Sequence, residues 1–148
     1  MQFSIKACLL LLAAVAIALP ACKKDDGAAK EEILTSKSCW KQTKSESYDD
    51  TTKQWSDDTI DDCDKDDCTS FKSDKTLTID EGAVKCDPSD PQSTPGTWSL
   101  SSDGKTMTLT DTGLGITLTG NVVELSDTKL VLEINFLGFK SRLTWQPS

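Results

Sequence analysis

The sequence contains no histidine and few aromatic residues. Histidine is absent from all 148 residues, and Phe, Trp and Tyr together make up 6% of them. The chain therefore lacks the side chain whose ordinary pKa lies closest to neutral pH. It also lacks a Gly-x-Ser-x-Gly elbow and a phosphate-binding loop. These absences argue against an enzyme, and we expect no catalytic residues and no cofactor.

Two further shortages narrow the choice of partner. Without histidine and without a Cys-x-x-Cys pair, the sequence offers no zinc site, and we expect no metal. Lys and Arg number 16 against 24 Asp and Glu, which gives a net charge of −8. Binding to a nucleic-acid backbone needs a basic patch, so we expect no nucleic-acid partner. We interpret the acidity as a solubilising surface on a monomeric protein.

Only one long apolar run is present, and it is too short to span a bilayer comfortably. It covers residues 7–19, follows Lys6 and has the length of a secretory signal. It ends in Leu19-Pro20-Ala21-Cys22, which resembles a bacterial lipobox, although Pro20 departs from the commonest pattern. The resemblance implies cleavage before Cys22, lipidation of its thiol and stable membrane anchoring by several acyl chains. The alternative is an ordinary cleaved signal with a chance cysteine.

The charged residues after Cys22 bear on location. Lys23-Lys24-Asp25-Asp26 resembles the export signal of Bacteroidetes-type lipoproteins, which implies transport to the outer membrane and, further, to the cell surface. The alternative is a solvated start of a tether. We assign residues 1–21 to a lipoprotein signal peptide and residues 22–36 to the lipidated cysteine and a flexible tether, with some helix over residues 28–34. Residues 37–148 form the domain.

Four cysteines remain for the domain once Cys8 leaves with the signal and Cys22 is lipidated: Cys39, Cys63, Cys68 and Cys86. An even number in an exported chain predicts two disulfides, with three possible connectivities. Cys63 and Cys68 enclose only four residues, so separate partners would constrain more of the chain. We predict Cys63–Cys86 and Cys39–Cys68, each stabilising the fold by roughly 3 kcal/mol in the chain-entropy model.

Apolar residues alternate with polar ones from about residue 38 onward, which is the period of a strand. Thr106–Thr110 alternates in this way, and so do residues 130–136. Asp103-Gly104 is the strongest hairpin signal, and Leu137-Gly138 marks another reversal. A change of parity predicts a bulge or turn at Gly120-Asn121. The pattern predicts an all-β, up-and-down antiparallel barrel of about eight strands, stapled by disulfides.

Several stretches together resemble the lipocalin-like lipoprotein domains of Bacteroidetes-type bacteria over most of residues 38–147. They are Asp62-Cys63-Asp64-Lys65-Asp66-Asp67, Phe71 with Ser73-Asp74, residues 80–88, Gly96-Thr97-Trp98-Ser99-Leu100, Asp103-Gly104-Lys105 and residues 125–132. The resemblance implies a small antiparallel barrel and supports the Cys63–Cys86 bridge. Cys39 and Cys68 are additions to the family pattern, and Lys75 stands where glycine is frequent. Most members have no assigned activity, so the resemblance implies little about function.

An acidic segment between residues 57 and 67 contains a candidate calcium motif. Asp62-x-Asp64-x-Asp66 begins like an EF-hand loop. Asp67 and Ser73 then occupy the positions where that loop needs glycine and glutamate. We therefore interpret the segment as a solvated loop without a metal.

The aromatic residues give the better candidates for binding. Trp98, Trp145 and Phe71 lie in alternating segments and are expected in the core. Trp55 has polar neighbours and is expected to be exposed. Phe136, Leu137 and Phe139 surround a tight turn, so with Trp55 they are the candidate ligand-binding residues, the alternative being a simple packed hairpin. We also expect Arg142 to make a cation–π contact with Trp40 that closes one barrel end.

Two hypotheses for function follow. The first is a membrane-anchored cell-envelope module that holds a small apolar or glycan-like ligand, and it predicts a cavity of some 300 Å³ or more. The second is a structural or protein-interaction lipoprotein, inhibitor-like in one version, that uses its loops against a partner. It predicts a filled barrel and no small-molecule ligand.

Overall fold

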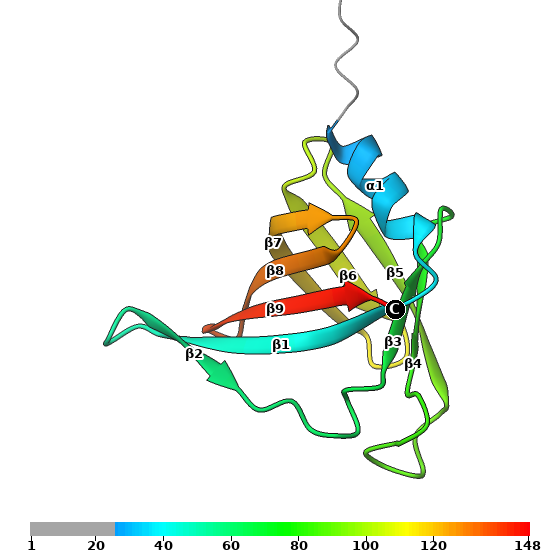
Figure 1. Ribbon diagram of the computed structural model, residues 1–148, viewed down its shortest axis with the longest axis horizontal. Coiled ribbons are helices and arrows are strands. Elements are labelled where there is room, and N and C mark those ends of the chain that lie inside the picture. The colour runs from blue at the N-terminus through cyan, green and yellow to red at the C-terminus, as the bar shows by residue number, and fades with distance from the viewer. Residues whose placement is uncertain (1–25) are drawn as a thin grey trace, which may run out of the picture.

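The computed structural model describes residues 26–148, which form one helix and nine strands (Figure 1). In chain order these are α1 (Asp26–Ser36), β1 (Trp40–Asp49), β2 (Gln54–Asp58), β3 (Cys68–Phe71), β4 (Thr76–Asp80), β5 (Ser93–Leu100), β6 (Thr106–Asp111), β7 (Ile116–Ser126), β8 (Lys129–Phe136) and β9 (Phe139–Pro147). The predicted signal peptide and the lipidation at Cys22 lie outside these residues. Within them, no helix has the length and apolar character needed to cross a membrane.

Eight of the strands close into an antiparallel barrel, which confirms the predicted fold class. Strands β3 to β9 each pair with the next in sequence, and β9 pairs back onto β1 from Trp40 opposite Pro147 to Ser47 opposite Ser141. The circle is completed by β1 and β3. The ninth strand, β2, pairs only with the far half of β1 and projects beside the barrel (Figure 1).

The predicted reversals lie where the sequence placed them. Leu137 and Gly138 have φ angles of 52° and 86°, as a two-residue hairpin turn with the twist of its flanking strands requires. Gly104 has φ 65°, and Lys75 adopts φ 70°. The parity change in β7 is a bulge, because the register shifts between Val122 and Glu124. It therefore lies at Val123 and not at Gly120-Asn121.

Helix α1 lies across one end of the barrel (Figure 1). Gly27 N donates to Ser102 O at 3.1 Å and Lys30 Nζ to Gly104 O at 2.8 Å, both in the β5–β6 turn. Leu34 is fully buried in the barrel core, and its carbonyl accepts a 3.1 Å hydrogen bond from Trp40 Nε1. The helix expected over residues 28–34 is present and extends from Asp26 to Ser36, but it is docked on the barrel, so the segment is not a flexible tether from Asp26 onward.

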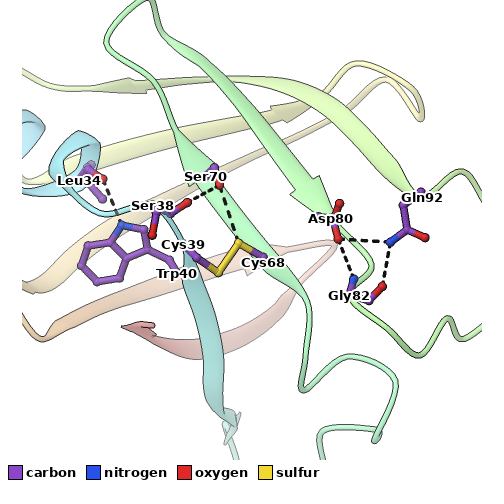
Figure 2. Close-up of a disulfide and its surroundings, with 9 residues drawn as sticks. All are labelled: Leu34, Ser38, Cys39, Trp40, Cys68, Ser70, Asp80, Gly82 and Gln92. Carbon is purple, nitrogen blue, oxygen red and sulfur yellow. Dashed lines mark hydrogen bonds between the residues drawn. A yellow bond between two sulfur atoms is a disulfide. The ribbon is translucent and has the colours of Figure 1, made fainter.

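Both predicted disulfides are present. Cys39–Cys68 has a Cα–Cα distance of 5.3 Å, and Cys63–Cys86 one of 5.1 Å. Figure 2 shows the first at the junction of β1 and β3, beside the hydrogen bond from Ser70 Oγ to Ser38 O at 2.6 Å. The second joins the β2–β3 loop to the β4–β5 loop, which lie at the end opposite α1.

Candidate functional site

The barrel contains a cavity of about 580 Å³. Its walls are mainly apolar side chains from strands all around the barrel: Trp40, Phe71, Leu77, Ile79, Leu109, Leu118, Leu130, Leu143 and Trp145. A volume of 300–1,000 Å³ with apolar walls and a few polar groups is typical of sites for small ligands. The interior is therefore hollow enough for a guest molecule.

The end of the barrel nearest α1 is filled. Leu34 of the helix packs there in one core cluster with residues that do not line the cavity, among them Trp98, Met107 and Leu132. Trp98 and Phe71 are buried in edge-to-face contact with ring centroids 5.6 Å apart, as the sequence analysis expected of core aromatics. The helix and these side chains close this end, so we call it the closed end.

The cavity opens at the opposite end. Leu114 and Ile116, at the β6–β7 turn, line the cavity yet are 73% and 40% exposed. The β2–β3 loop contributes Thr59 and Ile60 to the same rim. That loop is held by Cys63–Cys86 within its span and by Cys39–Cys68 where it enters β3. We call this end the mouth, and the disulfides fix one of its edges.

The charged groups that line the cavity are all carboxylates: Asp64, Asp67 and Asp111. Asp111 Oδ1 accepts hydrogen bonds from Gly113 N at 2.7 Å and Leu114 N at 2.8 Å, so it shapes the β6–β7 turn. Asp67 directly precedes β3, and its Oδ1 is buried without a hydrogen-bond partner in the described residues.

The pKa of Asp67 is raised to about 6, first by partial burial and then by the neighbouring carboxylates of Glu81, Asp64, Asp66 and Asp80. A carboxyl group in this setting resists ionisation because its charge is poorly solvated and repelled by like charges. Such a perturbed group beside a cavity is a functional-site candidate.

Trp55 lies outside the cavity and is not the exposed residue that the sequence suggested. It is half-buried on β2, where its ring lies 5.1 Å from that of Tyr48 and 4.1 Å from Arg142 Cζ. Arg142 Nη2 also pairs with Glu133 Oε1 at 2.6 Å. The expected cation–π contact between Arg142 and Trp40 is therefore wrong, because Trp40 points into the core and Trp55 takes the guanidinium.

Phe136, Leu137 and Phe139 are 42%, 81% and 77% exposed at the β8–β9 turn. None of them lines the cavity. Asp67 and Leu114 were not predicted because they lie in loops, where alternation carries no information about which way a side chain points, and Ile116 is the first residue of β7. For Leu109, Leu118 and Leu143, strand parity was the available signal.

The acidic loop shows no converging set of metal ligands among the described residues. Asp62 Oδ1 pairs with Lys65 at 2.5 Å, whereas Asp66 Oδ2 accepts from Ala83 N at 2.6 Å and Val84 N at 3.2 Å. The group Cys63, Asp64 and Cys86 is compact, but both sulfurs belong to the disulfide and are not thiolate ligands. A calcium site would need six to eight oxygens around one point.

Comparison with known proteins identifies a family to which the sequence is similar. The sequence model of the lipocalin-like domain family matches residues 39–132, which is more than half of the chain. The matched residues run from the start of the barrel into β8, and β9 completes the circle. No curated protein matches the chain.

Proposed function

The chain belongs to the lipocalin-like domain family, and from this premise we propose that its barrel binds a small, largely apolar ligand through the mouth. The observation that carries the proposal is the cavity of about 580 Å³ with apolar walls. An apolar ligand in a cavity of this size would make dispersion contacts with its walls. Members of such a family act in general as binding proteins, and the proposal assigns no catalytic step.

One observation favours a second function for a different surface. The exposed apolar side chains of the β8–β9 turn, Phe136, Leu137 and Phe139, form a tip that suits contact with a protein partner. The version of this hypothesis that has a filled barrel does not agree with the cavity. A partner contact at the tip and a ligand in the cavity are compatible, since they use different residues.

We further propose that the protein is exported, lipidated on Cys22 and held at the outer membrane, on the side that faces the cell exterior. The support is the apolar run over residues 7–19, the lipobox-like Leu19-Pro20-Ala21-Cys22 and the charged residues that follow. The four residue steps from Cys22 to Asp26 reach at most about 14 Å. Because Asp26 begins the helix on the closed end, this anchor would hold that end toward the bilayer and the mouth away from it.

Ligand binding is tested with Nile red, a neutral dye that fluoresces in apolar surroundings. We expect saturable binding by the wild type and its loss in Leu118→Trp, which fills the cavity from β7, and in Leu109→Trp, which fills it from β6. Phe139→Ser changes the exposed tip and serves as the matched control that keeps binding. Binding that survives both tryptophan substitutions, in folded protein, places the dye elsewhere and contradicts the proposal.

Lipidation is tested by labelling producing cells with radioactive palmitate. We expect label in the wild type and none in Cys22→Ser, and we expect globomycin to cause accumulation of an uncut precursor. Equal labelling of the two proteins, or normal processing under globomycin, argues for an ordinary signal peptide.

A further inference from the structure

We propose that the ligand is an amphipathic amine, whose apolar part occupies the cavity and whose ammonium group pairs with Asp67 at the mouth. The inference rests on the proposed function and names the chemical class of its ligand. It is carried by three observations on the cavity: the sign of its charges, the lack of compensating cations around them, and a carboxylate in its wall that accepts no hydrogen bond from the described residues.

The first observation is the sign of the charges. Asp64, Asp67 and Asp111 are all acidic, and no lysine or arginine lines the cavity. A ligand with a carboxylate or phosphate head would meet like charges where the apolar walls end. Charges next to a low-dielectric cavity are poorly screened by water, so the repulsion is stronger there than on an open surface. The mouth therefore selects against anionic amphiphiles.

The second observation is that these charges are not compensated by the protein. Asp67 lies close to four other acidic residues, namely Asp64, Asp66, Asp80 and Glu81. Across residues 26–148, none of the five takes part in an ion pair. The two lysines of the adjoining loops are engaged elsewhere, Lys65 with Asp62 at 2.5 Å and Lys85 with the carbonyl of Asp90 at 2.5 Å. Neither lysine therefore competes with a bound cation for these carboxylates.

The third observation singles out Asp67 within the group. Asp66 and Asp80 each have one oxygen that accepts hydrogen bonds. Asp66 Oδ2 accepts from the backbone N–H groups of Ala83 and Val84. Asp80 Oδ1 accepts from Gly82 N at 3.0 Å and from Gln92 Nε2 at 3.2 Å (Figure 2). Oδ1 of Asp66 and Oδ1 of Asp67 are both buried without a hydrogen-bond partner in the described residues. Of the two residues, only Asp67 lines the cavity, and neither of its oxygens accepts a hydrogen bond there.

A buried acceptor without a donor carries a desolvation cost that native proteins rarely leave unmet. The three N–H groups of a primary ammonium would supply a donor to Asp67 and a charge to its acidic neighbours at once. A bare metal ion satisfies only part of this description, because it would leave the apolar walls uncovered and the carboxylates are aimed at separate donors. An amine joined to an apolar body fits both parts of the site.

The experiment compares decylamine, decanol and decanoate, which share one chain and differ in the head group. Each displaces Nile red from the full chain at pH 7.5, at concentrations below micelle formation. We expect decylamine to bind at least fivefold more tightly than decanol, and decanoate to bind more weakly than decanol. Added salt should reduce the advantage of the amine, since the difference is electrostatic.

Two variants test whether the preference for decylamine over decanol depends on the carboxylate of Asp67. Asp67→Asn should bring decylamine close to the affinity of decanol and leave decanol unchanged, which also shows that the variant is folded. Asp62→Asn removes an exposed carboxylate of the same loop that is paired with Lys65 and does not line the cavity, so it should retain the preference.

The outcomes separate this inference from the function on which it rests. If the three compounds displace the dye equally, or if Asp67→Asn leaves the preference for amine intact, the amine inference is wrong while the binding function stands. If none of them displaces the dye and the dye itself does not bind, both are overturned.

Discussion

Trp40 lies opposite Thr69 in the single register pair that joins β1 to β3 in the described chain. Every other neighbouring pair of barrel strands shares at least four such pairs. The disulfide between Cys39 and Cys68 connects the residues immediately before this pair (Figure 2). The barrel is therefore closed at its weakest seam by a covalent bond more than by backbone hydrogen bonds.

Removal of this bridge should open the seam. We expect the double variant Cys39→Ala, Cys68→Ala to lose about 3 kcal/mol from the loss of the cross-link alone, and more from fraying of β1 from β3. Urea unfolding gives the total, and hydrogen exchange of β3 amides reports the fraying. The matched control is Cys63→Ala, Cys86→Ala, which opens a loop of similar length, 23 against 29 residues. Equal losses in the two variants would show that the seam has no special dependence on its disulfide.

Helix α1 should be part of the cooperative unit. Leu34→Ala removes a fully buried side chain from the core cluster, so we expect a loss of about 3 kcal/mol and earlier exchange at the closed end. Ser36→Ala, at an exposed position of the same helix, is the control and should change little. A loss below about 1 kcal/mol for Leu34→Ala would mean that the helix docks independently of the barrel.

Much of the fold followed from the sequence because strand periodicity and turn chemistry are local. Asp103-Gly104 and Leu137-Gly138 specify their turns through backbone conformations that few residues adopt easily. The docking of Leu34 was missed because helix α1 has no amphipathic pattern and its segment is polar in composition. A single buried leucine that joins the barrel core has no periodic signature, so its burial is seen only in the tertiary structure.

The candidate site was harder to predict for a related reason. Exposed aromatic residues such as Phe139 attract attention in a sequence, whereas a cavity depends on which inward side chains are too small to meet across the barrel. The acidic loop was interpreted as solvated, and most of it is. Asp67 differs because it lines the cavity directly before β3 and is partly buried, and no sequence spacing distinguishes it from Asp62 or Asp64.

Asp67 should make stability depend on pH in an unusual direction. The pKa of its carboxyl is raised from 3.8 to about 6 in the folded chain, so between about pH 4 and pH 6 the folded state binds more protons than the unfolded state. The contribution of this group to stability therefore falls as pH rises through that interval. We expect Asp67→Asn to be more stable than wild type above about pH 7 and to lose this advantage near pH 4.

Thermal unfolding of the two proteins across the interval measures the effect. Asp62→Asn is the control, because Lys65 holds the pKa of Asp62 below its usual value and its loss should give no gain at high pH. A constant difference between Asp67→Asn and wild type at all pH values would show that Asp67 titrates normally.

The orientation on the membrane follows from the position of α1 and is open to measurement on the lipidated protein in vesicles. A fluorophore attached at Asp127→Cys marks the closed end, since Asp127 pairs with Lys37 just after the helix at 2.9 Å. A fluorophore at Leu114→Cys marks the mouth. Lipids with nitroxide head groups quench by proximity, so we expect strong quenching at residue 127 and weak quenching at residue 114. The short reach from Cys22 to Asp26 requires this order if the anchor is Cys22. Stronger quenching at the mouth would mean that the barrel lies with its cavity against the bilayer, and a ligand would then enter from the lipid and not from the aqueous phase.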